Sequence, residues 1–190
     1  MQTLLSAMSG PGEAQAGLVA LADLEALASA AGAAERILDV GCGLGARTLQ
    51  LALAFPGAQA IGVDPRLDEE ARERAEALAA TLGAGGRVRF EGGGFADPET
   101  SRLSLAADRR RVALVGPRLA ERHGPFDLIF IGGLTTAEAR AADIRLAASA
   151  LSPSGVIAVD RAVGPAGASV RAGVFEFLRF APDFVFVHAP

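Results

Sequence analysis

The stretch ILDVGCGLGARTLQLA (Ile37–Ala52) decides the fold of this chain. It runs from an apolar segment through three closely spaced glycines, Gly41, Gly43 and Gly45, into a segment that favours helix. Glycine tolerates backbone angles that other residues avoid, and it lets backbone N–H groups come close to a ligand. The stretch therefore predicts a buried strand, a sharp ligand-binding turn and a helix in direct succession.

Two aspartates near this glycine turn narrow down the kind of ligand that it predicts. The turn alone also fits the G-x-G-x-x-A pattern of dinucleotide sites, so a nicotinamide-dependent oxidoreductase is one alternative. Asp39 lies two residues before Gly41, where a carboxylate can orient the turn or meet a cationic ligand group. The next apolar segment, AIGVDP, ends in Asp64, which is placed to accept both hydroxyls of a ribose. Together they predict a nucleotide-like cofactor.

Short apolar segments alternate with longer segments rich in Ala, Leu, Glu and Arg. This alternation is typical of α/β proteins with a parallel sheet, whose strands are apolar on both faces. We expect strands at Arg36–Val40, Ala58–Val63, Arg87–Glu91, Phe126–Ile131, Gly155–Asp160 and Phe184–His188. We expect helices near Gly12–Ala31, Ala46–Ala54, Asp68–Leu82, Thr136–Leu151 and Ala168–Phe180.

Two regions leave alternatives open. The segment FEFLRF within Ala168–Phe180 also fits a strand, but Val170, Val174 and Phe177 share one helical stripe, so we favour a helix. The region Asp97–Gly124 is expected to contain a helix that ends near its C-terminal limit, and an exposed loop around the arginines at 109–111.

The composition fits one globular domain over residues 1–190. A net charge of −4 and the absence of Trp and Tyr argue against a nucleic-acid partner. The chain contains no Lys, which excludes a catalytic lysine. Cys42 is the only cysteine, which fits a reducing cytoplasm. No apolar run reaches the roughly 20 residues that a membrane helix needs, so we expect neither export nor a membrane anchor.

Four motifs together resemble class I (Rossmann-like) S-adenosylmethionine-dependent methyltransferases. They are LDVGCGLG, IGVDP, FDLIFIGG (Phe126–Gly133) and LSPSGVIAVD (Leu151–Asp160), in this order and at this spacing. The similarity covers about residues 12–188, and it is closest to the small-molecule O-methyltransferases of the catechol and caffeoyl-CoA kind. It implies a three-layer sandwich around a mostly parallel sheet.

The resemblance implies a role for each residue that matches a motif. Asp39 and the loop Gly41–Gly45, Cys42 included, would hold the methionine moiety of S-adenosylmethionine, and Asp64 would bind its ribose. Adenine would lie between the residues after the third strand. Pro65 and Gly132 complete the expected set, whose adenine-binding members are Gly92, Gly93 and Phe95.

The chain departs from the cation-dependent members of this class at the metal site. Where they carry a metal-binding aspartate and, three residues on, a lysine base, this chain has Gly132 and Thr135. Their second metal position, an Asp-Asn pair, is Asp160-Arg161 here. One hard oxygen ligand remains, and Arg161 would repel a cation, so we expect no metal.

Asp160 is the candidate general base. Methyl transfer depends mainly on position, orientation and a dry pocket, and it needs a base only when the acceptor starts protonated. A strand-end carboxylate that pairs with Arg161 is the structural alternative for Asp160. His123 precedes a strand and so lies at the opposite edge of the sheet, His188 is a weaker candidate, and Cys42 is expected to pack.

The sequence thus predicts metal-independent methyl transfer to an oxygen or nitrogen of a small molecule. The alternative is a cofactor-binding protein of this fold that transfers no methyl group. The class closes its sheet with an antiparallel strand pair, whereas this chain ends soon after DFVFVHAP. Either the last strand is missing or FEFLRF belongs to the sheet. A missing strand leaves an apolar edge open, and this predicts a homodimer.

Overall fold

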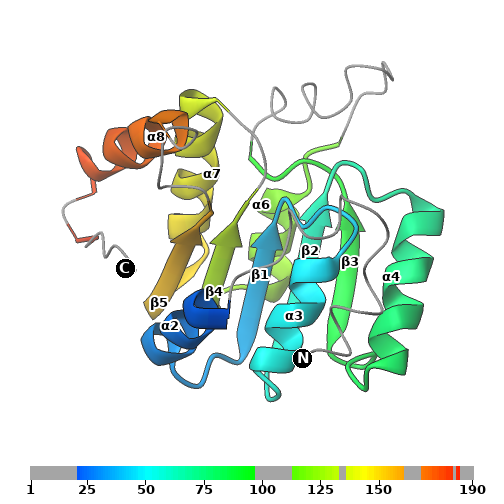
Figure 1. Cartoon of the computed structure of the whole chain (residues 1–190). Helices are drawn as coiled ribbons and strands as arrows, with labels where there is room; N and C mark the ends of the chain where they lie inside the picture. The colour runs from blue at the N-terminus through cyan, green and yellow to red at the C-terminus, as the bar shows by residue number, and fades with distance from the viewer. Residues whose placement is uncertain (1–20, 97–112, 133–135, 161–167, 182, 185–190) are drawn as a thin grey trace.

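The computed structural model describes residues 21–96, 113–132, 136–160, 168–181 and 183–184. At their centre lies a five-stranded sheet in the order β3-β2-β1-β4-β5, in which all neighbours are parallel (Figure 1). The strands are β1 (Arg36–Val40), β2 (Gln59–Asp64), β3 (Val88–Gly92), β4 (Phe126–Ile131) and β5 (Leu151–Val159). The predicted α/β class with a parallel sheet is confirmed.

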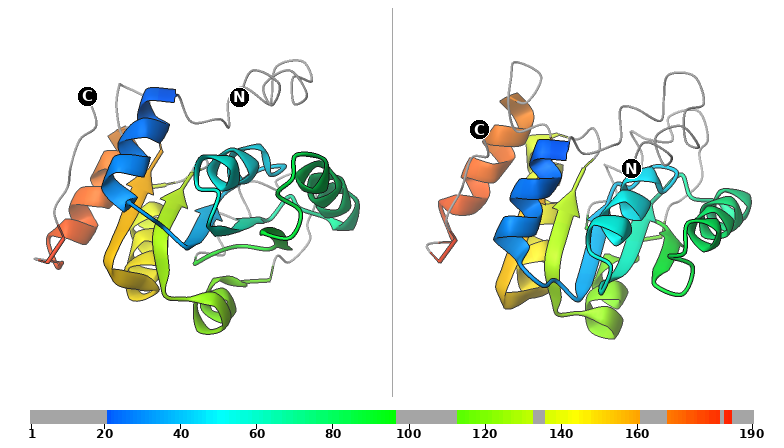
Figure 2. Two further views of the ribbon diagram at one scale, coloured as in Figure 1. Left: turned by 90° about the horizontal axis from the view of Figure 1, so that it is seen from below. Right: turned by 60° about the horizontal axis from the view of Figure 1, so that its bottom comes forward.

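Helices cover both faces of the sheet. One face carries α2 (Leu21–Ala31), α3 (Ala46–Ala54) and α4 (Glu69–Thr81). The other carries α6 (Gly116–His123) and α7 (Ala137–Ser149), with α8 (Ala168–Leu178) packed against α7. Figure 2 shows the sheet between these two layers of helices. This is the three-layer sandwich that the sequence predicted.

Successive residues of the central strands lie alternately in the two hydrophobic cores, so each of these strands is apolar on both faces. Ile37 and Leu128 lie in the core under α3, whereas Leu38 and Ile129 lie in the core under α7. All four side chains are fully buried. This double covering explains why the strands read as continuous apolar runs.

The largest error in the predicted elements concerns the start of β5. The helix predicted to reach Leu151 ends at Ser149, and the strand predicted from Gly155 already begins at Leu151. Leu151 pairs with Phe126, and the register then shifts so that Val156 pairs with Leu128. The Ser-Pro-Ser-Gly segment, which signals a loop in sequence, is therefore an irregular stretch inside the strand.

The other described elements agree with the sequence to within a few residues. Ala168–Leu178 is a helix, so FEFLRF is not a strand, and the helix predicted to end near His123 is α6. The expected strand Phe184–His188 lies outside the described residues except for Phe184, which is not in a strand. Residues 12–20 of the first helix and the arginines at 109–111 also lie outside them.

Two further expectations stay predictions. Within the described part of the chain, β5 pairs only with β4, and this edge is the basis of the predicted homodimer. The single domain over residues 1–190 likewise stays a prediction.

None of the described helices combines the length and apolar character needed to cross a bilayer.

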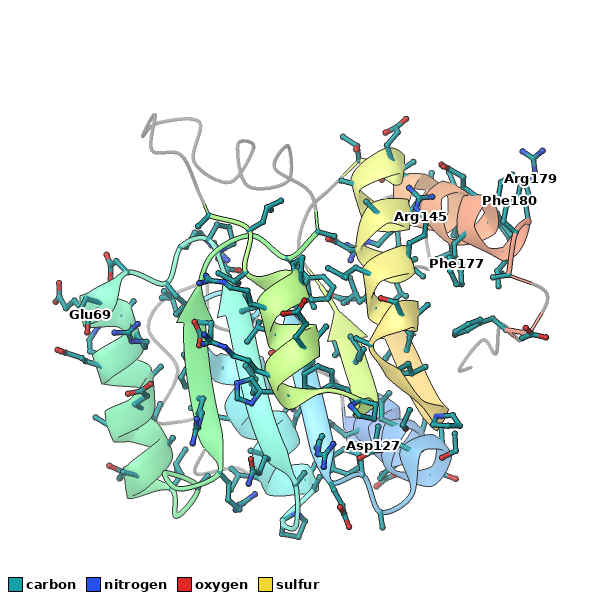
Figure 3. The ribbon with its side chains drawn as sticks, turned by 180° about the vertical axis from the view of Figure 1, so that it is seen from behind. Glu69, Asp127, Arg145, Phe177, Arg179 and Phe180 are labelled. Atoms are coloured by element: carbon teal, nitrogen blue, oxygen red, sulfur yellow. The ribbon has the colours of Figure 1, made fainter. Side chains whose placement is uncertain are left out.

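Asp127, near the amino end of β4, forms hydrogen bonds to the amino ends of β1 and β5. Figure 3 labels this residue. Its Oδ2 accepts hydrogen bonds from the backbone N–H groups of Glu35 and Arg36, both at 3.0 Å, and its Oδ1 accepts one from the Ser152 hydroxyl at 2.9 Å. Partial desolvation raises the pKa of Asp127, but these hydrogen bonds outweigh it and hold the pKa below its ordinary value. The ionised carboxylate therefore stabilises the fold.

This arrangement predicts a pH-dependent effect of Asp127→Asn. Because the folded-state pKa is depressed, the stabilisation is complete above the unfolded-state value of about 3.9 and is lost as pH falls through the folded-state pKa. Urea denaturation should show the variant less stable by about 1 kcal/mol at pH 6, with the difference shrinking toward about pH 3. Glu73→Gln, on the exposed face of α4, is the control. An equal difference at both pH values would contradict the assignment.

Candidate active site

The glycine turn lies at the carboxyl edge of the sheet, where the strand order reverses. From β1 the chain continues through β2 and β3 on one side and then crosses to β4 on the other. The N–H groups of Gly41 and Cys42 donate to Val63 O at the end of β2, and Gly132 N donates to Val40 O. Ligands of open α/β sheets bind in the crevice at such a switch point.

Gly45 shows why the turn requires glycine. It has φ of +95° and caps α3, and a Cβ there would lie 2.6 Å from the ring of Phe90. Gly41 and Gly43 also have positive φ, at 71° and 64°. A side chain at Gly45 would thus add backbone strain to a clash inside the core.

Asp39 forms a buried ion pair with Arg47 beneath the turn. The carboxylate is fully buried, and its Oδ1 accepts hydrogen bonds from Arg47 Nε at 2.8 Å and Nη2 at 2.5 Å. Its Oδ2 accepts one from the Thr48 hydroxyl at 2.7 Å. Asp39 can therefore act on a ligand only through Arg47 and the turn, rather than by direct contact.

Arg47 extends from α3 across the end of β1. Its Nη2 also donates to Val40 O at 3.2 Å and Gly41 O at 2.9 Å, and its guanidinium lies 4.5 Å from the ring centroid of Phe130. Burial lowers the pKa of Arg47, but the charge of Asp39 and its hydrogen bond raise it above the ordinary value, so the side chain stays charged. Nothing in the local sequence singles out Arg47, because an arginine in the first turn of a helix usually faces solvent.

Asp64 connects the turn to the tips of β2 and β3. Its Oδ2 accepts a hydrogen bond from Gly43 N at 2.8 Å, and its Oδ1 accepts one from Arg66 N at 2.8 Å. Its backbone carbonyl accepts one from Gly93 N at 3.1 Å, and Pro65 follows in the turn. The structure therefore brings the predicted ribose-binding carboxylate directly against the glycine turn.

The residues predicted to flank adenine lie in different environments. Gly92 ends β3, and a Cβ there would overlap the backbone carbonyl of Leu67, so the chain passes closely at this point. Gly93 lies beside Asp64, as described above. The ring of Phe95, in contrast, is buried in the core together with Val115. Its predicted contact with adenine stays a prediction.

Gly132 and Asp160 meet at Arg47. A Cβ at Gly132 would overlap Arg47 Nη1, so the guanidinium fills the place of a side chain at the end of β4. The Asp160 carboxylate, at the end of β5, lies 3.9 Å from the same nitrogen. Thr135 and Arg161 lie outside the described residues. Arg47 thus lies between two carboxylates, those of Asp39 and Asp160.

Cys42 points inward from the turn. Burial, together with the nearby charges of Asp39 and Asp64, raises the pKa of its thiol well above the ordinary value. A buried, protonated thiol is a poor nucleophile. This agrees with the packing role expected for Cys42.

His123 lies far from the turn, at the amino edge of the sheet. It lines a cavity of about 850 Å³ together with Arg36, Arg122 and Phe55. The position agrees with the prediction from sequence, and the cavity is separate from the carboxyl-edge site. His188 lies outside the described residues. Within the parts of the chain that the structure describes, no three His, Cys, Asp or Glu side chains form a metal-binding group.

Comparisons with known proteins agree with this architecture. The family model described as a methyltransferase domain matches residues 38–161, well over half of the chain. A search of curated proteins finds no match. Solved structures that resemble this one share the fold at low sequence identity.

Three solved structures illustrate the likeness. Cofactor-bound Rv0187 from MTB is 22% identical, with a TM-score of 0.60 over 96% of this chain and 76% of its own. A methyltransferase from Geobacter sulfurreducens is 15% identical, with a TM-score of 0.57 over 86% and 73%. An O-methyltransferase family protein from Burkholderia thailandensis is 17% identical, with a TM-score of 0.51 over 75% of this chain but 40% of its own. This chain therefore spans less than half of the last protein.

The fold, the switch-point turn and the family match define a class I methyltransferase of Rossmann-like fold. The chain belongs to the methyltransferase-domain family, and the recognition made from its motifs is confirmed. The methyl donor of this class is S-adenosylmethionine.

Proposed function

We propose that this domain transfers a methyl group from S-adenosylmethionine to an oxygen, or a nitrogen, of a small molecule without a metal ion. The observation that carries the proposal is the glycine turn at the strand-order reversal, bonded through Gly43 N to the carboxylate of Asp64. The turn supplies backbone donors and close approach, and the carboxylate supplies acceptors for ribose hydroxyls. When bound, the sulfonium supplies an activated methyl group that the acceptor displaces in line.

The residues present fit this cofactor. Gly41–Gly45 and the Asp39–Arg47 pair would hold the amino-acid end, and Asp64 with Pro65 would hold the ribose. Gly92 packs against the carbonyl of Leu67 and Gly93 packs against the carbonyl of Ala113, so these glycines would meet the adenine through backbone groups at the tip of β3. The Arg47 guanidinium, with the Asp160 carboxylate 3.9 Å from its Nη1, suits a ligand that carries both an ammonium and a carboxylate.

Arg47 supports metal independence. In the cation-dependent relatives a metal ligand projects from the position of Gly132, whereas here that space holds a buried guanidinium. A divalent cation beside this fixed positive charge would be repelled, because burial leaves little solvent to screen the two charges. The missing carboxylate and the added cation thus both disfavour a metal.

Composition supports the proposed acceptor class and compartment. A net charge of −4 and the lack of Trp and Tyr favour a small molecule over a nucleic acid. The single buried cysteine suits the reducing cytoplasm, where we place the protein.

Calorimetry and a methyl-transfer assay test the proposal. S-Adenosylmethionine and S-adenosylhomocysteine should both bind, and labelled methyl should reach a member of a panel of phenols, carboxylic acids and amines. Turnover should be the same with EDTA as with added Mg²⁺. Stabilisation by NAD but not by S-adenosylhomocysteine would contradict the proposal. Binding without turnover on any acceptor would favour the alternative, a cofactor-binding protein without methyl-transfer activity.

Asp160→Asn tests the proposed base. If Asp160 removes the acceptor proton, the variant should lose about 100-fold or more in kcat while keeping its affinity for S-adenosylhomocysteine. The loss should be largest for acceptors of high pKa and should vanish for acceptors that are already ionised. Equal losses for both kinds of acceptor would leave Asp160 with a positioning role beside Arg47. Glu138→Gln, on the exposed first turn of α7, is the matched control.

A further inference from the structure

A cavity lies at the amino edge of the sheet, at the opposite end of the strands from the glycine turn. It has a volume of about 850 Å³, which is within the range of small-molecule binding sites. Its walls come from three connections of the chain, which lie between α2 and β1, between α3 and β2, and between α6 and β4. Figure 2 (left) shows the molecule from this side. The proposed methyl transfer makes no use of this cavity.

Most of the charged side chains that line the cavity are basic. Arg36, Arg122 and His123 belong to the lining, and its acidic side chain is that of Glu35. Within the part of the chain that the structure describes, the side chains of Arg122 and His123 form no hydrogen bond or ion pair. Arg36 uses one donor there, from Nη1 to Pro125 O at 3.4 Å, which is long for a hydrogen bond. The cavity thus presents N–H donors that the described protein leaves largely unused.

The charges around the lining leave an excess of positive charge. Asp127 lies near enough to Arg36 for their charges to interact, but three hydrogen bonds already satisfy its oxygens. Arg87 lies behind the lining, where its Nη1 binds carbonyl oxygens at the end of α3. On α6, Arg118 and Glu121 lie outside the lining and offset each other. Three arginines therefore stand against two carboxylates before His123 is counted, namely Arg36, Arg87, Arg122, Glu35 and Asp127.

Helix ends account for part of this charge. The carboxyl end of a helix carries a partial negative charge that favours a nearby cation, and α2, α3 and α6 all end at this edge. Arg122 and His123, in the last turn of α6, can act in this way, and Arg87 does so at the end of α3. Arg36 begins a strand instead, so no helix end explains its place in the lining.

The rest of the lining is apolar apart from Gln59. It includes Pro56, the buried residues Phe55 and Phe126, and alanines and glycines, whose small size leaves the space open. Basic side chains beside an apolar wall match a ligand that has an acid group at one end of an apolar body. A free inorganic ion would use only the first of these features, and a neutral apolar molecule only the second.

We propose that this cavity binds a small organic anion, in which a carboxylate or phosphate group is attached to an apolar body. The acid group lies against Arg36, Arg122 and His123, and the apolar body lies against Pro56 and the alanines around it. Arginine N–H groups match the oxygens of a carboxylate or phosphate in charge and shape. The cavity and the glycine turn lie at opposite edges of the sheet, so this ligand is independent of the proposed methyl transfer.

Three naphthalene probes test the site by NMR spectroscopy on the purified full chain. 1-Naphthoate carries a carboxylate, 1-naphthyl phosphate carries a phosphate, and 1-naphthalenemethanol has the same rings without a charge. The chain has two histidines, so the variant His188→Gln assigns the ring signals of His123. At least one anion should shift these signals with a dissociation constant below about 1 mM, and about tenfold or more tighter than the alcohol. The tighter of the two anions identifies the acid group.

Two variants should change the affinity for this anion in opposite directions. Arg122→Gln removes a charged donor and should weaken binding about tenfold, with little effect on the alcohol. Glu35→Gln removes the acidic side chain of the lining and should strengthen binding of the anion about two- to fivefold. Arg118→Gln, one turn earlier on α6 and outside the lining, is the matched control and should stay within about twofold of the wild type.

Three results would overturn the site. They are an alcohol that binds as tightly as both anions, His123 signals that no probe shifts, and a loss with Arg122→Gln no larger than that with Arg118→Gln. Each of them leaves the proposed methyl transfer standing, because the cofactor and acceptor assays described above measure that activity separately.

Discussion

Asp39→Ala is expected to lower the free energy of unfolding by about 3–5 kcal/mol, because it leaves a buried arginine without its counter-charge. Asp39 is fully buried and Arg47 is 4% exposed, so water cannot replace the lost carboxylate. The Thr48 hydroxyl loses its acceptor in the same variant. Chemical denaturation followed by circular dichroism measures the effect.

Two companion variants identify the source of the loss. Thr48→Val removes one hydrogen bond to Asp39 and should cost about 1 kcal/mol. Asp39→Ala combined with Arg47→Met removes both charges and should be more stable than Asp39→Ala alone, because the two sites interact directly. A loss below about 1 kcal/mol for Asp39→Ala would contradict a desolvated ion pair.

The same ion pair shows where sequence reasoning reached its limit. The strand, the turn and the helix around it were predicted, because apolar runs and glycines act locally. Asp39 was singled out by its distance from the turn. Its partner was not, because the burial of Arg47 depends on Phe130 and Gly132, more than eighty residues away in the chain. Contacts at such separation leave no local pattern.

The start of β5 was predicted wrongly for a related reason. Ser-Pro-Ser-Gly is a loop signal, and the local rule gives a break before Gly155. In the folded chain, Leu151 pairs with Phe126, and the Ser152 hydroxyl bonds to Asp127. These tertiary contacts draw the residues before the proline into the strand. The carboxyl end of β5, which positions Asp160, lies within one residue of its predicted limit because no such conflict occurs there.

Asp64 illustrates the part of the site that sequence could place. Its spacing from the glycine turn predicted a carboxylate at the tip of the neighbouring strand, and the parallel register of β1 and β2 brings it there. The bond from Gly43 N to Asp64 Oδ2 adds a function that spacing alone did not predict, since it holds the turn itself. One residue thus shapes the turn and presents acceptors to the ligand.

Asp64→Ala is accordingly expected to weaken the binding of S-adenosylhomocysteine by roughly 100-fold or more, because it removes charged acceptors from the ribose and frees Gly43. An ionised carboxylate offers about four acceptor positions. Arg66 N and Nε take two on Oδ1 and Gly43 N takes one on Oδ2, so one position on Oδ2 is left for a ribose hydroxyl. Calorimetry with S-adenosylhomocysteine measures the loss. Adenine alone should lose much less affinity, because it has no ribose.

Asp68→Ala is the matched control for this variant. Asp68 is a nearby carboxylate that caps α4 by accepting a hydrogen bond from Ala71 N at 2.8 Å. Its loss should cost about 1 kcal/mol of stability and leave the affinity for S-adenosylhomocysteine unchanged. The affinity of Asp64→Asn for S-adenosylhomocysteine should lie between those of Asp64→Ala and Asp68→Ala, because the amide can still accept a hydrogen bond from Gly43 N but lacks the charge. If Asp64→Ala binds within threefold of the wild type, the ribose does not lie at the tip of β2.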